Sequence, residues 1–132
     1  MVYFTANALK LGKLGIAPDL TSDLMGSYSP EDNLLNIVKF TFENDAMYLN
    51  SISGNTTPYS GDVINIFNGE VNKEKNYTWP FYEFESSSSA KELKVGERIY
   101  HKQTLYHFKG TKEDLNKISK KVLGVNLNTI PL

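Results

Sequence analysis

Hydrophobic and polar positions follow a helical period most clearly in residues 111–123. Thr111 can cap the start of a helix, and Asp114 lies three residues on, where a carboxylate favours a helix N-terminus. The apolar residues of one face are Leu115, Ile118 and Val122. Gly124 follows as a left-handed stop. The pattern predicts one amphipathic helix that covers a sheet or the open end of a barrel.

Residues 33–109 show the alternation of short strands, with many aromatic and β-branched side chains. The first two runs, 37–42 and 47–52, flank the turn-forming pair Asn44-Asp45. A two-residue loop there would set Phe42 opposite Met47. The sequence therefore predicts a hairpin between these two runs.

The later runs predict further strands. Residues 63–67 are apolar on both faces, as in a well-covered strand, and Asn68-Gly69 would end it before a charged, exposed stretch at 70–76. The aromatic run 77–84 contains Pro80, so we expect an edge strand or a bulge there. Two further expectations concern the chain after it: a type II turn at 94–97 with Gly96, and at 98–109 one long strand or a hairpin about Lys102-Gln103.

The two ends of the chain have weaker patterns. Residues 1–30 predict an irregular segment with a short helix over 5–14, a turn at 17–19 and one helical turn over 21–25. The tail, 125–132, alternates imperfectly and is compatible with a last short strand.

Together these elements predict a single domain, 1–132, that is mostly β or α+β. We expect an antiparallel sheet or small barrel of about six to eight strands, with one C-terminal covering helix. The strand–turn rhythm ending in a helix is similar to lipocalin-like barrels in architecture. Met25-Gly26-Ser27-Tyr28, however, lacks the tryptophan that the lipocalin opening motif has after its glycine.

Composition removes several classes of function. With 14 basic and 15 acidic residues the net charge is −1, which argues against nucleic acid as a partner. The chain has no cysteine, so disulfides and thiolate chemistry are excluded. No apolar run approaches the roughly 20 residues of a membrane span, and no basic region precedes an apolar one as in a signal peptide. We expect a soluble protein without membrane insertion, whose compartment the sequence leaves open.

Candidate catalytic groups are few. His101 and His107, the two histidines, would lie about 20 Å apart on one continuous strand, too far for one metal ion. Glu83 and Glu85 share a strand face near Trp79, a combination reminiscent of glycosidases, although a solvated strand end explains them as well. Familiar hydrolase, nucleotide-binding and zinc-protease motifs are absent. We therefore expect no cofactor and no metal site, and we favour a protein that is not an enzyme.

Aromatic residues are the strongest functional signal, since Tyr and Trp combine an apolar body with a polar tip. Alternation places Tyr77, Trp79 and Phe81 on the face opposite Tyr82 and Phe84, so that one set points away from the core. The candidate ligand- or partner-binding residues are Trp79, Tyr77, Phe81, Tyr82, Tyr100 and Tyr106. They predict a non-catalytic binding protein that engages a partner protein or an apolar small molecule through an aromatic surface or barrel mouth.

Two alternatives stay open. One is a structural or assembly subunit of a surface or viral particle, in which the strand 77–84 pairs between chains and forms a homo-oligomer. The other is a carbohydrate-active enzyme that uses Glu83 or Glu85.

Overall fold

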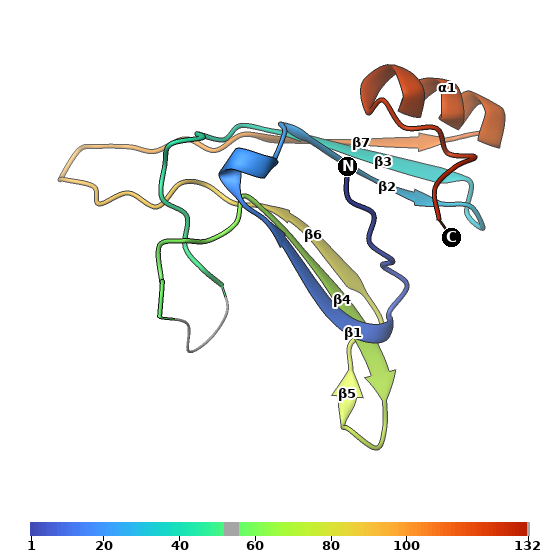
Figure 1. The fold of residues 1–132 in the computed structure, drawn as a ribbon, viewed down its shortest axis with the longest axis horizontal. Helices are drawn as coiled ribbons and strands as arrows, with labels where there is room; N and C mark the ends of the chain where they lie inside the picture. The colour runs from blue at the N-terminus through green and yellow to red at the C-terminus, as the bar shows by residue number, and fades with distance from the viewer. Residues whose placement is uncertain (52–55, 132) are drawn as a thin grey trace. The chain divides into compact units, whose positions relative to one another are not determined.

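The structure is a computed structural model that describes residues 1–51 and 56–131 (Figure 1). Within these ranges it has seven strands, one short 3-10 helix and one α-helix. The strands form two antiparallel sheets, neither of which closes into a barrel in the described part of the chain. The mostly β fold class with one C-terminal helix is confirmed, as open sheets.

The chain forms two compact units, each built from segments distant in sequence. The first contains Ser22–Phe40 and the chain from Lys102 onward, and the second contains Val2–Thr21 and Thr41–His101. Each unit has its own sheet.

The sheet of the first unit has the order β2-β3-β7. Its strands are β2 (Leu24–Ser29), β3 (Leu34–Phe40) and β7 (Gln103–Lys109). The helix α1 (Lys112–Val122) lies over one face of this sheet (Figure 1). The core between sheet and helix contains Leu35, Ile37, Leu115 and Leu127, each at most 2% exposed.

The predicted helix is confirmed together with its start and stop signals. Thr111 Oγ1 accepts a hydrogen bond from the Asp114 backbone N–H at 3.2 Å, and Gly124 has a φ of +69°. The buried face of the helix differs slightly from the predicted one, because Ser119 is fully buried whereas Val122 is 41% exposed. The prediction of a short strand in the tail is wrong. Leu127 instead packs into the core, and its N–H donates to Asn116 Oδ1 at 2.8 Å.

The sheet of the second unit is built around the long central strand β4 (Ile64–Asn72). β1 (Leu9–Ile16) pairs with one edge of β4, and β6 (Tyr82–Ser86) pairs with the other. β5 (Tyr77–Thr78) pairs with the end of β4. Figure 1 shows β1, β4 and β6 side by side, with β5 beyond them. A 3-10 helix, η1 (Pro18–Leu20), follows β1.

Two N-terminal predictions are wrong. Residues 9–16 form β1 rather than part of a helix over 5–14, and residues 24 and 25 begin β2 rather than end a helical turn over 21–25. Gly12 and Gly15 weaken any helix in the first segment, and pairing with β4 supplies the backbone hydrogen bonds. Tertiary pairing therefore outweighed weak local propensity.

The predicted hairpin between 37–42 and 47–52 is also wrong. β3 ends at Phe40, and its two neighbours are β2 and β7. Tyr48 forms only an isolated bridge, to Ser60, and residue 52 lies outside the described part of the chain. Alternation specifies which face of a strand is buried but not which strand lies beside it.

The predictions for residues 63–109 are partly confirmed and partly wrong. β4 continues through Asn68-Gly69, and Glu70, expected to be exposed, is buried. The edge position and the bulge expected for the aromatic run are both confirmed, since β6 is an outer strand and Pro80 separates it from β5. Gly96 has a φ of +88° in the predicted turn. Of residues 98–109, only those from Gln103 onward form a strand, β7.

Candidate functional site

Four aromatic rings gather on the sheet of the second unit: Phe67, Tyr77, Trp79 and Phe81, here called the aromatic patch. The rings of Tyr77 and Trp79 stack with centroids 4.9 Å apart. Trp79 meets Phe67 edge to face at 6.1 Å, and Phe81 lies 6.2 Å from Phe67. These spacings fall in the range of favourable aromatic pairs, so the four rings hold one another in place.

A β-bulge opposite Gly69 positions the patch. The register of the strand facing β4 shifts by one residue between β5 and β6. Around the shift, Trp79 N–H donates to the Glu70 carbonyl at 3.1 Å and Gly69 N–H donates to the Phe81 carbonyl at 2.9 Å. Pro80 lies between them and has no N–H to pair. A Cβ on Gly69 would lie 2.1 Å from the Trp79 carbonyl oxygen, so this close approach requires glycine.

The patch is half exposed and has a polar margin. Trp79 is 37% exposed and Phe81 is 43% exposed. Across the sheet, Phe67 is flanked by Lys13 of β1 and Glu83 of β6, and the Lys75 ammonium lies 5.9 Å from the centre of the Tyr77 ring. An apolar centre with charged residues at its margin is the usual anatomy of a protein-binding surface.

The structure brings together three of the six predicted site residues: Tyr77, Trp79 and Phe81. Tyr82 pairs with Asn68, the neighbour of Phe67 along β4, and therefore points to the other face of the sheet, as alternation predicted. Tyr100 is 80% exposed outside any strand.

The sixth predicted residue, Tyr106, belongs to the first unit, where its ring lies 6.4 Å from that of Phe108. Sequence reasoning missed Phe67, the ring at the centre of the patch. The run 63–67, apolar on both faces, predicts a well-covered strand, so the sequence pattern gives no sign that the face with Phe67 is left partly open.

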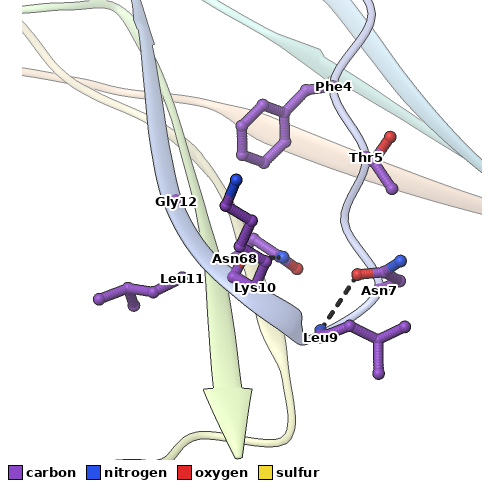
Figure 2. A pocket seen from close by; sticks show the side chains of 8 residues that line it. All are labelled: Phe4, Thr5, Asn7, Leu9, Lys10, Leu11, Gly12 and Asn68. Atoms are coloured by element: carbon purple, nitrogen blue, oxygen red, sulfur yellow. Dashed lines mark hydrogen bonds between the residues drawn. The ribbon is translucent and has the colours of Figure 1, made fainter. Parts of the chain in front are cut away.

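A pocket of about 450 Å³ lies between the N-terminal segment and the start of β1 (Figure 2). Figure 2 shows the Phe4 ring and the Lys10 side chain turned toward the same space, while Leu11 points away from it. The lining residues are Phe4, Thr5, Asn7, Leu9, Lys10, Leu11, Gly12 and Asn68. Sequence reasoning missed this pocket because its upper wall, residues 4–7, is not a regular element.

A buried polar side chain of β4, Asn68, holds the wall of the pocket in place. The pairing of β1 with β4 shifts between Leu9 and Gly12. Asn68, 2% exposed, accepts from Ala8 N–H at 2.8 Å and donates to the Lys10 carbonyl at 2.7 Å. Ala8 has a φ of +56°, which few residues other than glycine adopt. The Asn68 amide therefore replaces backbone pairing where the strand is irregular.

Two carboxyl groups of this unit have shifted pKa values. Hydrogen bonds from Asn72 and from Leu11 N–H, with the charge of Lys75, lower the pKa of Glu70. Burial raises the pKa of Asp62, an effect that the charge of Lys13 partly offsets. Glu70 binds the backbone of β1 at Leu11, and Asp62 lies against Gly15 of β1.

The two histidines lie in different units. His101 Nε2 lies 2.8 Å from Ser86 Oγ, and His107 Nδ1 lies 2.5 Å from Asn36 Oδ1. In residues 1–51 and 56–131, no group of three or more His, Cys, Asp or Glu side chains could hold a metal ion.

Glu83 and Glu85 are both exposed on one face of β6. Their use by a carbohydrate-active enzyme stays a prediction. Unchanged turnover in a Glu83→Ala/Glu85→Ala double variant would contradict it.

The whole chain, residues 1–132, matches the model of one protein family, described as a family of unknown function (DUF6786). The chain belongs to this family. Comparison of this DUF6786 sequence with curated proteins and with solved structures finds no similar protein. Over the described residues, no helix combines the length and the apolar character needed to cross a bilayer. The aromatic patch and the pocket are the two features of the described residues that suggest a function.

Proposed function

We propose that this protein is a non-catalytic binding protein that engages a partner protein through the aromatic patch. The observation that carries the proposal is the exposure of Trp79 and Phe81, at 37% and 43%, in a cluster whose rings fix one another. Each exposed Å² of these rings forgoes about 25 cal/mol that burial would supply. A partner that covers the patch recovers this free energy.

The local architecture supports binding in two ways. The patch rests on paired strands and on a bulge that admits only glycine at position 69, so its rings are ordered before a partner arrives. Pre-ordered side chains lower the entropy cost of association. Trp and Tyr are also the residue types that most often dominate binding energy in protein interfaces.

The test has two steps: capture of a partner by crosslinking at Phe81, and then fluorescence of Trp79, the single tryptophan of the chain. A photo-crosslinking residue placed at Phe81 should capture a partner in cells that make the protein. The same residue at Tyr100, which is 80% exposed outside the patch, serves as the control position. The purified partner should then shift the emission of Trp79 on titration, because covering the indole changes its solvent.

The variant Trp79→Ala should weaken this affinity at least about 30-fold, the size expected of a central interface residue. Its affinity is measured by calorimetry, since the fluorophore is lost. Tyr100→Ala should bind as the wild type does. Equal capture from both positions, or an unchanged affinity of the Trp79 variant, would contradict the proposal.

The pocket favours a second candidate function, binding of an apolar small molecule that carries an acidic group. Phe4 and Leu9 supply apolar contacts, and Lys10 is the one charged lining residue. No acidic side chain pairs with Lys10 in the described ranges. An ammonium beside an aromatic ring suits a ligand with a carboxylate or sulfonate next to an apolar ring.

Anilinonaphthalene sulfonate is a suitable probe, because it combines an apolar fluorophore with one sulfonate. Titration should show saturable binding that Lys10→Met weakens about tenfold through loss of the charged contact. Lys120→Met, on the exposed face of α1, is the matched control and should bind normally. Equal binding of the probe by the Lys10→Met and Lys120→Met variants would contradict binding in this pocket.

A further inference from the structure

β7 is the more exposed of the two edge strands in the first unit's sheet. In the order β2-β3-β7 it pairs with β3 alone among the described strands (Figure 1). Five of the seven residues of β7 are exposed, whereas one of the six residues of β2 is. An exposed edge strand presents its outward backbone donors and acceptors to any extended chain that can pair with them.

The register identifies the outward backbone groups of β7. Gly110 N–H donates to the Asn33 carbonyl at 3.3 Å, and in an antiparallel ladder every second residue bonds the same neighbour. The residues of β7 that bond β3 are therefore Thr104, Tyr106 and Phe108, and those that face away are Leu105, His107 and Lys109.

These outward groups form an open edge. Within residues 1–51 and 56–131, the backbone N–H and C=O groups of Leu105, His107 and Lys109 have no hydrogen-bond partner. Gln103, at the start of β7, has a further interaction, so the open edge begins at Leu105. It runs from Leu105 to Lys109.

The opposite edge of this sheet, along β2, is less accessible. The Leu24 carbonyl accepts a hydrogen bond from Ser22 Oγ at 3.1 Å. A Cβ on Gly26 would lie 2.6 Å from Leu123 Cδ1, so the residue that follows α1 packs directly against β2. The edge of β7 is therefore the better docking site for an extended chain.

The chain along this edge carries positive charge only. Over residues 102–112 the charged residues are Lys102, Lys109 and Lys112. In the part of the chain that the structure describes, Lys109 and Lys112 form no ion pair. The acidic residues that come next, Glu113 and Asp114, are paired with Lys117. Charge complementarity therefore favours an acidic occupant of the edge.

We propose that β7 binds an extended, acidic segment of a partner protein, which adds to the sheet as a fourth strand. In antiparallel addition, Leu105, His107 and Lys109 each use one N–H and one C=O, which gives six backbone hydrogen bonds. Main-chain pairing of this kind supplies affinity, and the side chains on the two faces supply specificity.

The two faces of β7 specify the side chains of the bound segment. Tyr106 and Phe108 pair with core residues of β3 and so lie on the face that α1 covers; their rings are 6.4 Å apart. Tyr106 is 45% exposed, so an apolar side chain opposite it gains by burial. On the other face, carboxylates opposite His107 and Lys109 neutralise the edge. The segment therefore alternates acidic and apolar residues.

A second copy of this chain is the competing occupant. Its own β7 would bring the same positive charge to the edge, with no acidic residue over 102–112 to neutralise it. A lysine on an edge strand opposes pairing with a copy of that edge, but it attracts a strand of opposite charge. The charges therefore favour the acidic segment.

Titration of the isotope-labelled intact protein with the peptide acetyl-Thr-Glu-Val-Glu-Val-Thr-amide tests the proposal by nuclear magnetic resonance. Antiparallel addition sets its two glutamates opposite Lys109 and His107 and its two valines opposite Phe108 and Tyr106. We expect saturable shifts of the amides of β7, and slower hydrogen exchange at Leu105, His107 and Lys109 in the complex. The same peptide with lysine in place of glutamate should bind at least about tenfold more weakly.

Two changes in the protein separate edge pairing from misfolding. Leu105→Pro removes an outward N–H but no bond to β3, and should bind the acidic peptide at least about fivefold more weakly than Leu105→Ala, which keeps the N–H. Lys109→Glu should weaken binding of the glutamate peptide and strengthen binding of the lysine peptide. A misfolded variant would not gain affinity. Lys120→Glu, on α1, should behave as the wild type does.

Three results would overturn the proposal: no saturable binding of the acidic peptide, equal binding by the two Leu105 variants, or unchanged affinities for both peptides in Lys109→Glu. A dimer that pairs through β7 in the absence of peptide would also overturn it, because the occupant would then be a second copy. Trp79→Ala should bind the peptide normally, which keeps this test independent of partner binding at the aromatic patch.

Discussion

The carboxylate of Glu70 accepts a hydrogen bond from the backbone N–H of Leu11, with 3.1 Å between Oε2 and N. Its other oxygen, Oε1, accepts from Asn72 Nδ2 at 2.8 Å and lies 3.6 Å from Lys75 Nζ. A side chain of β4 thus binds the backbone of β1 where the register of the two strands shifts.

Glu70→Gln should lower the stability of the protein at neutral pH, because the neutral amide pairs less well with Leu11 and Lys75. The pKa of Glu70 is lowered from 4.5, so the ionised group stabilises the fold above that pH, and the contribution disappears as pH falls through the lowered value. Urea unfolding of both proteins from pH 7 to about pH 3 should show the difference shrink on acidification. Glu83→Gln, an exposed control, should show little difference at any pH; a pH-independent loss for Glu70→Gln would contradict this reasoning.

Asp62→Asn should have the opposite pH profile. Asp62 lies against the Cα of Gly15, and burial raises its pKa above 3.8, so the folded state favours the protonated acid. Stability therefore falls as pH rises through the raised value, and the amide, which has the same shape, removes this cost. Thermal melts should show the variant more stable than wild type at pH 7 and equal to it below pH 3.8. A variant that is less stable at pH 7 would show that the attraction of Lys13 exceeds the cost of burial.

Gly69→Ala should destabilise the second unit and disturb the aromatic patch. The added Cβ would lie 2.1 Å and 2.7 Å from the carbonyl oxygens of Trp79 and Phe81, so the bulge must move. Overpacking of this kind costs about 1–3 kcal/mol, and the tryptophan emission should shift to the red as Trp79 becomes more exposed. A Cβ added at Gly110 would have no atom within 4 Å, so Gly110→Ala is the matched control. Unchanged emission in the Gly69 variant would show that the bulge does not hold the ring.

Ser119→Ala should stabilise the first unit. Ser119 is fully buried, and its hydroxyl has no hydrogen-bond partner in residues 1–51 and 56–131. Alanine removes the unpaired polar group and has the higher helix propensity, so we expect a gain of about 1 kcal/mol in the free energy of unfolding. Chemical denaturation measures it. A loss of stability would mean that the hydroxyl is satisfied in solution, for instance by a bound water.

The sequence predicts best where the signals are local. Thr111, Gly124 and Gly96 act through their own backbone conformation, and the structure has a cap, a stop and a turn at these positions. Pro80 likewise acts locally, because a residue without an N–H must interrupt a ladder. The separation of Trp79 from Tyr82 follows from the two-residue period of a strand.

What the sequence could not predict depends on distant partners. Local signals in residues 5–14 favour a helix over the strand β1, because the strand that pairs with β1, β4, begins only at Ile64. The charged stretch around Glu70 predicts exposure because its partner Leu11, which lies 59 positions earlier in the chain, meets it only when β1 lies beside β4. The pocket and the ring cluster around Phe67 arise in the same way, from contacts across the sheet rather than along the chain.

The division of the first unit between two distant segments has a consequence for synthesis. Asn36 and His107, which meet across β3 and β7, are 71 positions apart, and the core residues Leu115 and Leu127 come later still. At about 5–20 residues per second, a nascent β2–β3 hairpin waits on the order of 4–15 s for the strand and helix that cover Leu35 and Ile37. During that time its apolar face is open to chaperones and to other nascent chains. Slower synthesis or a higher temperature should therefore reduce the yield of folded protein before it reduces the stability of the protein once folded.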